Sequence, residues 1–335
     1  MPKASSTSAP RHVLVTGGAG FIGSHVVDAL LGQGRAVTAI DNFDPFYDAG
    51  VKRQNLASAA GHPGFRLIEG DVRDAAALAA LPDDIDAVVH LAALAGVRPS
   101  IARPVEYVDV NVRGTQVLLE WARVRRIPQF VFASSSSVYG VDPDVPWRES
   151  DVGLRPISPY AATKVSGELL GHSYSHLSGL RFIALRFFTV YGPRQRPDLA
   201  IHRFATLMRR GEPIPVYGDP AATRRDYTYI DDVVSGVVAS VDYRASDYEV
   251  INLGNASPVS LRELLDALES ALHVEGRIEP LPPQPGDVPQ TWADVSKAGR
   301  LLGYSPSTPL AVGLERFARW LDTHEEASSG AIRQR

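Results

Sequence analysis

Short runs of apolar residues alternate with longer stretches of helical periodicity through the first half of the chain. The apolar runs are nearly continuous and lie at 12–17, 36–41, 65–71, 86–93, 129–135 and 180–188. Continuous apolar runs are typical of parallel strands that are covered on both faces. Because helical segments separate them, the pattern predicts an α/β fold built on a Rossmann-type, doubly wound parallel sheet.

The pattern changes after about residue 190, where Pro and Gly become dense. Helical periodicity persists near 198–210, 229–241, 260–272 and 309–323. The apolar run at 249–254 is predicted to return to the main sheet. We therefore expect a first domain at 11–190 with return segments near 229–255. A smaller, interleaved C-terminal domain would occupy mainly 191–323, and 1–10 and 325–335 read as disordered tails.

Composition narrows the class of protein. The chain has 335 residues, 44% hydrophobic and 21% charged, as in an ordinary globular protein. It has no cysteine, which excludes disulfides, thiol nucleophiles and zinc–thiolate sites. No apolar run reaches the roughly 20 residues of a membrane span, and the start shows no signal-peptide core. We therefore expect a cytoplasmic protein that does not have a membrane as partner. The net charge of −4 gives no general attraction to nucleic acid, so no nucleic acid partner is expected either.

A glycine-rich turn follows the first apolar run. Gly17, Gly20 and Gly23 form a G-x-x-G-x-x-G pattern between a predicted strand and an amphipathic helix. This arrangement lets a pyrophosphate approach the backbone at the start of a helix. Asp41 ends the next strand, where a carboxylate accepts from ribose hydroxyls and repels a 2′-phosphate, so NAD is favoured over NADP. A plain turn is the structural alternative for both features.

Further cofactor contacts are expected from the ends of the predicted strands and from the start of the first helix. Asp71, after the third strand, is expected near the adenine amine. The full expected set for NAD comprises Gly17, Gly20, Phe21, Ile22, Gly23, Asp41, Asn42, Asp71, Val72, Leu91, Ala92, Ala93, Tyr160 and Lys164.

The chemistry is predicted at a tyrosine–lysine pair. Tyr160 and Lys164 are four residues apart at the start of a predicted helix and therefore share a face. A tyrosine has a free pKa of about 10, and a neighbouring cation favours the phenolate. Ser135 ends the fifth strand, 25 residues before Tyr160. It belongs to a run of four serines, of which Ser134 is expected to have a structural or cofactor-facing role.

Taken together, the glycine loop, Ser135 and Tyr160-x-x-x-Lys164 resemble the extended short-chain dehydrogenase/reductase family in its nucleotide-sugar epimerase branch. The resemblance runs from about 12 to 322. Within that branch the chain is most similar to UDP-glucuronic acid 4-epimerases, through the stretches LAALAGVRPS, NVRGTQVLLEWAR, LRFFTVYGPRQRPD, RRDYTYIDDVV, NLGNASPVSLRELL and GDVPQTWADVSKAGRLLGY.

The resemblance implies tightly held NAD, a UDP-sugar substrate and a homodimer, with helices near 101–125 and 160–178 as candidate dimer interface. It makes 11–190 the NAD-binding domain and 191–323 mainly the UDP-sugar-binding domain. It implies that Tyr160 takes the proton of the sugar 4-hydroxyl, that Ser135 hydrogen-bonds the reacting oxygen, and that Lys164 binds the nicotinamide ribose. The reaction implied is the 4-epimerisation of UDP-glucuronic acid to UDP-galacturonic acid, through a transient 4-keto intermediate that is reduced again on its other face.

A uronic acid oxidised at C4 is a β-keto acid, so an epimerase must restrain its carboxylate against loss of CO2. Ser136, Ser137 and Thr189 are candidate hydroxyls for this, and Arg196 is a candidate cation, with Arg194 as its alternative. Thr189 stands where UDP-glucose 4-epimerases usually carry Asn. Ser137 stands where related dehydratases and decarboxylases usually carry an acidic residue.

For the UDP moiety the resemblance suggests Arg98, Val216, Tyr217, Arg225 and Asp287. The family often has Arg three residues before this Asp, whereas this chain has Gln284; Arg224 is a candidate replacement. The alternatives are a UDP-glucose 4-epimerase or a UDP-glucuronate decarboxylase on the same scaffold, and a non-catalytic nucleotide-binding protein. His172 and His176 lack an acidic third ligand, so no metal site is expected.

Overall fold

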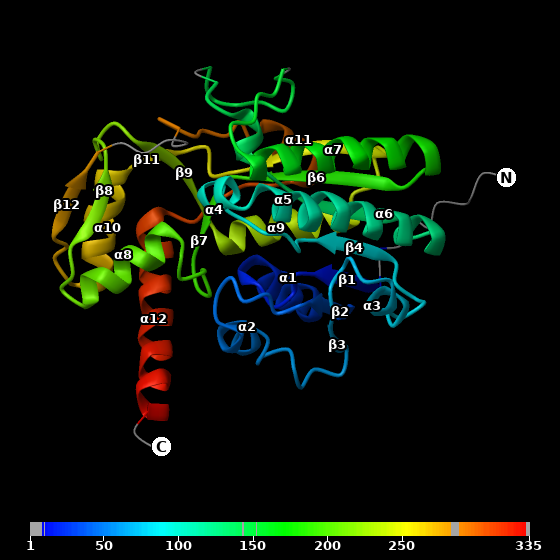
Figure 1. Cartoon of the computed structure of the whole chain (residues 1–335), viewed down its shortest axis with the longest axis horizontal. Helices are drawn as coiled ribbons and strands as arrows, with labels where there is room; N and C mark the ends of the chain where they lie inside the picture. Colours follow the sequence, from blue (N-terminus) through cyan, green and yellow to red (C-terminus); the bar gives the residue numbers. More distant parts are fainter. Residues whose placement is uncertain (1–8, 10, 143, 152, 283–287, 333–335) are drawn as a thin grey trace.

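The computed structural model describes residues 9, 11–142, 144–151, 153–282 and 288–332. Its centre is a seven-stranded parallel sheet in the order β10-β6-β5-β4-β1-β2-β3 (Figure 1). This sheet confirms the predicted doubly wound architecture. Its strands are β1 (His12–Thr16), β2 (Ala36–Asp41), β3 (Phe65–Glu69), β4 (Ala87–His90), β5 (Gln129–Ser135), β6 (Arg181–Phe187) and β10 (Tyr248–Leu253).

Both faces of the sheet are covered, which explains the continuous apolar runs. In β1, Val13 and Val15 pack in one apolar cluster, and Leu14 between them packs in the cluster of the opposite face. Helices α1 and α9 supply the first cluster, and α6 lies over the second. The helical segments up to β6 are α1 (Phe21–Gly32), α2 (Ala49–Asn55), α3 (Ala75–Ala79), α4 (Val97–Ala102), α5 (Pro104–Tyr107), η1 (Val108–Arg113), α6 (Gly114–Arg125), η2 (Ser136–Tyr139) and α7 (Pro159–Ser178).

The region near 101–125, expected to be helical, is a succession of segments. Helix α5 leads into the π-helical turn η1, which continues directly into α6. A π-turn adds one residue per hydrogen-bonded ring, so the faces of α5 and α6 are offset from each other.

A smaller lobe lies beside the sheet (Figure 1, left). It contains a three-stranded sheet of β7 (Thr189–Tyr191), β9 (Arg224–Tyr229) and β11 (Pro258–Ser260), and a parallel pair of β8 (Ile214–Tyr217) and β12 (Ile278–Leu281). The later helices are α8 (Ala200–Arg209), α9 (Ile230–Asp242), α10 (Leu261–Leu272), α11 (Ser296–Leu302) and α12 (Leu310–Ile332).

The two parts interleave along the chain. After β7, α8, β8 and β9, the chain returns with α9 against α1 and with β10 beside β6. The predicted return strand is therefore present. Helix α12 continues to Ile332, so residues 325–332 are helical where the sequence suggested a disordered tail. The tail expected at 1–10 falls almost entirely outside the described residues. In the described ranges, no helix has the length and apolar content that crossing a bilayer requires.

Candidate active site

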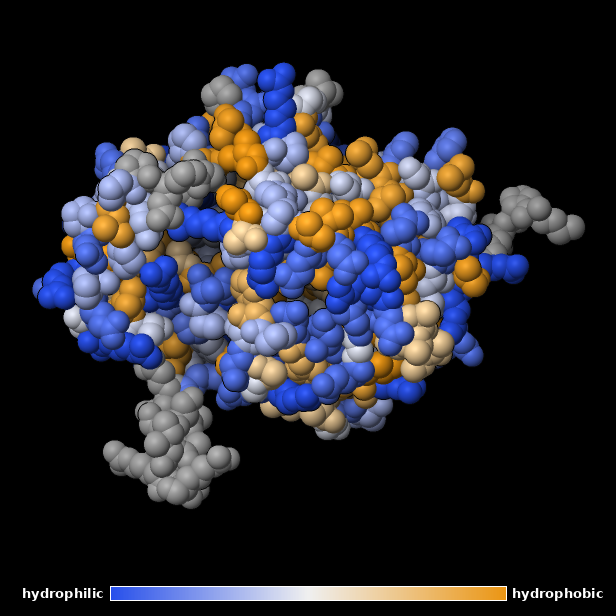
Figure 2. Space-filling view, viewed as in Figure 1, coloured by the Kyte–Doolittle hydropathy of each residue, from blue (hydrophilic) through white to orange (hydrophobic). Residues whose placement is uncertain are grey.

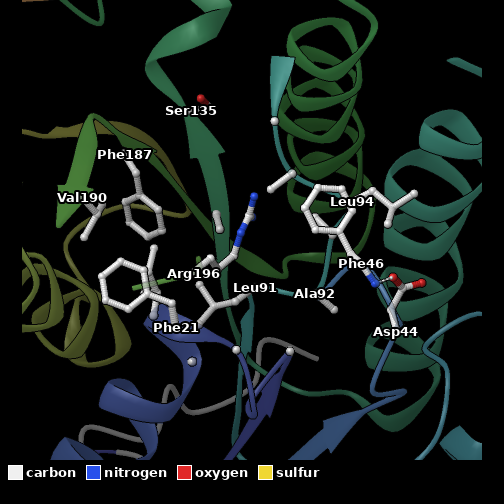
Figure 3. Close-up of a pocket in the computed structure, with 18 of the residues that line it drawn as sticks. Phe21, Asp44, Phe46, Leu91, Ala92, Leu94, Ser135, Phe187, Val190 and Arg196 are labelled. Atoms are coloured by element: carbon white, nitrogen blue, oxygen red, sulfur yellow. Dashed lines mark hydrogen bonds between the residues drawn. The ribbon is translucent and has the colours of Figure 1, made fainter. Parts of the chain in front are cut away.

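A cavity of about 450 Å³ opens at the carboxyl ends of the central strands (Figure 3). Such sheets bind ligands at this edge, where the strand order reverses. All residues expected to contact the cofactor line it, from Gly17 after β1 to Lys164 on α7. Ser135, Thr189 and Arg196 also line it. The cavity therefore gathers residues that are far apart in the sequence.

The glycine loop brings backbone to the cavity wall without side chains. Gly17 has φ +67°, and a Cβ there would lie 2.8 Å from the nitrogen of Ala92. A Cβ on Gly23 would lie 2.1 Å from the carbonyl oxygen of Gly17. Only glycine fits at either position. The start of α1 thus presents unpaired backbone N–H groups to the cavity, as pyrophosphate binding requires.

Asp41 ends β2, and its carboxylate is held in place by two backbone groups. Its oxygens accept hydrogen bonds from the nitrogens of Ala19 (3.0 Å) and Phe43 (2.8 Å). Each carboxylate oxygen has a second lone pair, so Asp41 retains the capacity to accept from hydroxyl groups in the cavity.

Asp71 also lines the cavity, but its carboxylate is more fully engaged. Arg73 donates to both of its oxygens at 2.9 and 2.7 Å, and Asn42 donates at 3.0 Å. These hydrogen bonds hold the pKa of Asp71 at about 2. Asp71 is therefore ionised at neutral pH, and Arg73 and Asn42 fix its orientation.

Helix α7 begins where the sequence places a cap and a proline. Ser158 accepts from the nitrogen of Ala161 at 3.1 Å, and Pro159 is the first helical residue. Tyr160 therefore lies in the first turn. Lys164, one turn later, is buried and donates to the carbonyl oxygen of Ala133 at 2.7 Å. Burial lowers the pKa of Lys164 to about 8.

The environment of Tyr160 acts on its pKa in opposing directions. Burial raises the pKa, whereas a hydrogen bond with Ser135 and the positive charge of Arg196 lower it. The ammonium nitrogen of Lys164 lies 5.7 Å from the centre of the Tyr160 ring. Arg196 is therefore a source of positive charge for Tyr160 that the sequence did not suggest.

The four serines have separate environments. The Ser134 hydroxyl donates to Glu168 at 2.5 Å, and Glu168 forms a buried ion pair with Arg186 at 2.9 and 2.8 Å. Ser134 thus ties β5 to α7 and β6, although it also contacts the cavity.

Ser135 bonds instead with Ser137 in η2. Its oxygen accepts from the nitrogen of Ser137 (3.2 Å) and from the Ser137 hydroxyl (2.9 Å). Because these bonds use its lone pairs, the Ser135 hydroxyl hydrogen is left to donate to the Tyr160 oxygen or to another acceptor in the site. Ser136 and Ser137 begin η2 and do not themselves line the cavity. Ser137 reaches the site through Ser135.

Arg196 extends into the cavity between Phe187 and Phe46 (Figure 3). Its guanidinium lies 5.1 Å from the centre of the Phe46 ring and forms a bidentate ion pair with Asp198 at 2.9 and 2.7 Å. Arg194, the alternative cation, pairs with Asp28 on α1 at 2.8 Å and does not line the cavity.

The residues suggested for UDP lie outside the cavity lining. Arg98 on α4 stacks over the ring of Tyr217 at 5.2 Å, which joins the sheet domain to the end of β8. Val216 is buried in β8. Arg225 on β9 donates to the carbonyl oxygen of its neighbour Arg224 at 2.8 Å. Asp287 and Gln284 lie outside the described residues.

A family model described as "NAD dependent epimerase/dehydratase family" matches residues 13–254. The chain belongs to this family. The match spans the glycine loop, the serine run, the Tyr160–Lys164 pair and the return strand β10, and so covers every element that builds the cavity.

Relatives named as UDP-glucuronate 4-epimerases are similar over most of the chain. UDP-glucuronate 4-epimerase 1 of Arabidopsis thaliana is 43% identical over 326 residues, covering 92% of this chain and 76% of the relative. UDP-glucuronate 4-epimerase of Thermodesulfobacterium geofontis is 41% identical, covering 92% and 95%. The crystal structure of UDP-glucuronic acid 4-epimerase from Bacillus cereus, in complex with UDP-glucuronic acid and NAD, has a TM-score of 0.87 at 39% identity and covers 93% of this chain and 99% of that one.

The site fits the dinucleotide that the family name implies. The Gly17–Gly23 cradle leaves room that a Cβ would fill, and Asp41 supplies a buried acceptor at the end of β2. Within the described residues, no group of three or more His, Cys, Asp or Glu side chains is placed to hold a metal ion. His172 packs edge-on against Tyr248, with 4.8 Å between the ring centres.

Sequence reasoning missed other residues that line the cavity of this family member. Lys52 is buried and donates to the carbonyl oxygen of Asp44 at 2.8 Å, and its ammonium lies 4.8 Å from the Tyr47 ring centre. The available signal was compositional, because the chain contains only four lysines. Phe46 and Phe187 carried no such signal, since large aromatic residues usually belong to the core.

Proposed function

We propose that the protein is an NAD-dependent UDP-glucuronate 4-epimerase, which interconverts UDP-glucuronic acid and UDP-galacturonic acid. The observation that carries this proposal is the position of Arg196 and Thr189 in the same cavity as Tyr160 and Ser135. A cation beside the candidate base suits a sugar with a carboxylate next to its reacting carbon. The names of the similar proteins support the same substrate.

The cofactor would lie along the cavity from the glycine loop to Tyr160. The start of α1 would hold its pyrophosphate, Asp41 its adenosine ribose and Lys164 its nicotinamide ribose. When bound, NAD supplies a reversible hydride acceptor, so the reaction needs no external oxidant.

Tyr160 and its neighbours would transfer one proton to and from the sugar. Tyr160 takes the proton of the 4-hydroxyl as C4 is oxidised, and Ser135 donates its hydroxyl hydrogen to the oxygen that becomes a carbonyl. Arg196 favours the ionised form of Tyr160, as its charge lowers the pKa of that hydroxyl. After the 4-keto sugar has turned its other face to the cofactor and been reduced, Tyr160 returns the proton to O4.

The carboxylate must be held away from the alignment that releases CO2. Arg196 and Thr189 reach the cavity directly, whereas Ser136 and Ser137 would act at its serine edge. For the nucleotide, we propose that Arg98, Val216, Tyr217 and Arg225 form the uridine diphosphate side, together with Asp287.

Incubation of the purified protein with UDP-glucuronic acid, without added NAD, tests the proposal. Nuclear magnetic resonance should show UDP-galacturonic acid without release of CO2. A UDP-pentose product would identify a decarboxylase, and turnover restricted to UDP-glucose would identify an epimerase of neutral sugars. Either result would refute the proposal.

Arg196→Ala tests the role of the cation, with Arg194→Ala as the matched control. We expect Arg196→Ala to reduce uronic acid turnover by about 100-fold and to leave bound NAD largely in place. Arg194→Ala removes a neighbouring arginine that pairs with Asp28 outside the cavity, so turnover should change little. Equal effects of the two changes would argue against a carboxylate contact.

We also propose that the enzyme is a homodimer that pairs through α4–α7. Exposed apolar side chains gather on these elements, namely Ile101, Val105, Val108, Val124, Leu169 and Leu177. Figure 2 shows hydrophobic surface over this part of the molecule. An apolar patch of this kind on a folded protein favours burial in an interface. Leu169→Glu should therefore shift the mass measured by light scattering to that of a monomer, whereas Val141→Glu, on an exposed valine elsewhere, should not.

A further inference from the structure

A chain of hydrogen bonds runs beneath the cavity, and His90 is its central residue. His90 is the last residue of β4 and is 2% exposed. Its Nδ1 lies 2.7 Å from the hydroxyl of Thr16 at the end of β1, and its Nε2 lies 3.0 Å from the hydroxyl of Thr115 on α6. The imidazole therefore connects two strands of the sheet to a covering helix.

The hydrogen bonds around His90 have one consistent direction. The Thr115 hydroxyl donates to the carbonyl oxygen of Asn111 at 2.6 Å, so its oxygen accepts from Nε2 of His90. Nε2 then carries the hydrogen, and Nδ1 accepts from the Thr16 hydroxyl. The Thr16 oxygen in turn accepts from the nitrogen of Ala92 at 3.2 Å. Burial lowers the pKa of His90 to about 3, so the ring is neutral and this pattern is complete at neutral pH.

At its other end, this chain of hydrogen bonds reaches α7, the helix that carries Tyr160. Asn111 lies in the π-turn η1, and its side chain pairs with both backbone groups of Leu94, at 2.8 and 2.9 Å. It also donates to the Thr163 hydroxyl at 3.1 Å, which donates to the carbonyl oxygen of Tyr160 at 2.7 Å. Asn111 thus clamps the segment after β4 and touches the first turn of α7.

We propose that His90 is a positioning residue, which holds the cavity-lining segment 91–95 in register with the Tyr160 end of α7 through Thr16, Thr115 and Asn111. The segment lines the cavity and lies directly against the glycine loop, because a Cβ on Gly17 would already collide with Ala92. A shift of this backbone would therefore disturb both the phosphate loop and the distance to Tyr160.

A purely structural role is the competing interpretation. The ring packs among Phe130 and Phe132, with 5.9 Å between ring centres in each case, so His90 also fills space in the core. The protein contains a second buried histidine–threonine hydrogen bond that serves as a comparison. Nε2 of His12 at the start of β1 lies 2.9 Å from the buried hydroxyl of Thr38, and neither residue lines the cavity.

The test compares Thr115→Val, which breaks the chain of hydrogen bonds, with Thr115→Ser, which keeps its hydroxyl. Thr38→Val removes an equivalent buried threonine–histidine bond away from the cavity. His90→Phe is a second variant that breaks these hydrogen bonds, and it keeps an aromatic ring at the site. For each protein we would measure the melting temperature, the NAD dissociation constant after removal of bound cofactor, and kcat and KM for UDP-glucuronic acid.

We expect Thr115→Val to raise the NAD dissociation constant and lower kcat by about 10-fold each, because the affected backbone faces both cofactor and base. KM for the sugar should stay within about twofold, and Thr115→Ser should restore wild-type behaviour. Thr38→Val should lower the melting temperature by a similar amount but change neither the NAD dissociation constant nor kcat.

Equal effects of Thr115→Val and Thr38→Val at the same loss of melting temperature would overturn the proposal, as would failure of Thr115→Ser to restore NAD affinity. The kcat readout rests on the proposed function, whereas the NAD measurement does not. If the wild-type protein binds NAD but does not turn over UDP-glucuronic acid, the proposed function fails. The NAD dissociation constants then decide the role of His90 by themselves.

Discussion

Arg196 donates its Nε and Nη2 hydrogens to the two carboxylate oxygens of Asp198, at 2.9 and 2.7 Å. The cation that lines the cavity is therefore already paired within the protein. A guanidinium has five N–H donors, so three remain after this bidentate contact. A substrate carboxylate would have to use these donors or displace Asp198.

Replacing Asp198 with Asn should strengthen binding of the uronic acid. The change removes a negative charge that competes for Arg196 and repels the substrate carboxylate. We expect KM for UDP-glucuronic acid to fall by about threefold, a modest effect because Asp198 is partly exposed and solvent screens it. Steady-state kinetics with UDP-glucose serve as the control, since a neutral sugar should not respond. A higher KM for the uronic acid would show that Asp198 instead orients Arg196 for binding.

Lys164→Met should make the cofactor-free protein more stable at neutral pH while abolishing turnover. Burial lowers the pKa of Lys164 from 10.5 to about 8, so keeping this lysine charged costs about 3 kcal/mol of folding free energy. Loss of the hydrogen bond to Ala133 offsets part of the gain, which leaves about 2 kcal/mol.

The gain should depend on pH in a defined direction. Between about pH 8 and 10.5 the unfolded chain holds a proton on Lys164 that the folded protein has released, so wild-type stability rises with pH there. The advantage of Lys164→Met is therefore largest below pH 8 and shrinks as the pH approaches 10.5. Urea unfolding at several pH values measures it. Lys297→Met, which removes a lysine paired with Glu249, should be neutral or destabilising throughout.

Ser134→Ala and Ser135→Ala should separate stability from catalysis at adjacent positions. Ser134→Ala leaves the buried Glu168–Arg186 pair without one donor and should lower the unfolding free energy by about 1–2 kcal/mol. Ser135→Ala removes the donor to the reacting oxygen and should lower kcat by about 100-fold, with a smaller loss of stability because the two hydrogen bonds that it loses from Ser137 are only partly buried. Denaturation and kinetics on both variants check this, and the reverse pattern would invalidate the assignment of the serines.

Ser137→Asp should discriminate against the charged substrate. The new carboxylate would stand beside Ser135, with which the Ser137 hydroxyl now bonds at 2.9 Å. Like-charge repulsion should raise KM for UDP-glucuronic acid by about 10-fold and change that for UDP-glucose less. Ser137→Thr, which retains a hydroxyl, is the control. An equal effect on both sugars would indicate that Ser137 only shapes the loop.

The sequence predicted the buried strands and the Tyr160–Lys164 pair, because in each case a local sequence pattern is compatible with few structures. The continuous apolar runs place β1, β2, β5 and β6 within a residue or two of their observed ends, since a strand covered on both faces has no alternation to misread. Tyr160 and Lys164 share a face of α7 because any helix brings i and i+4 together.

Other features depend on partners that no local pattern specifies. His90 is a single polar residue in an apolar strand, and its partners Thr16 and Thr115 lie on other elements. The π-turn at Val108–Arg113 is hidden because one extra residue barely alters helical periodicity. The polar residues after 324 suggested a tail, yet they continue the amphipathic helix α12, which starts at Leu310.

The return of β10 to the edge of β6 has a consequence for biosynthesis. As the ribosome delivers the chain, the cofactor-binding sheet is complete in sequence up to β6, but the outer edge of β6 has no partner until Leu253 has emerged. In that interval the nascent protein exposes an apolar strand with free backbone hydrogen-bonding groups, which is a site for aggregation. A fragment that stops near residue 190 would keep this open edge permanently, so such a fragment is a poor choice for a stand-alone NAD-binding protein.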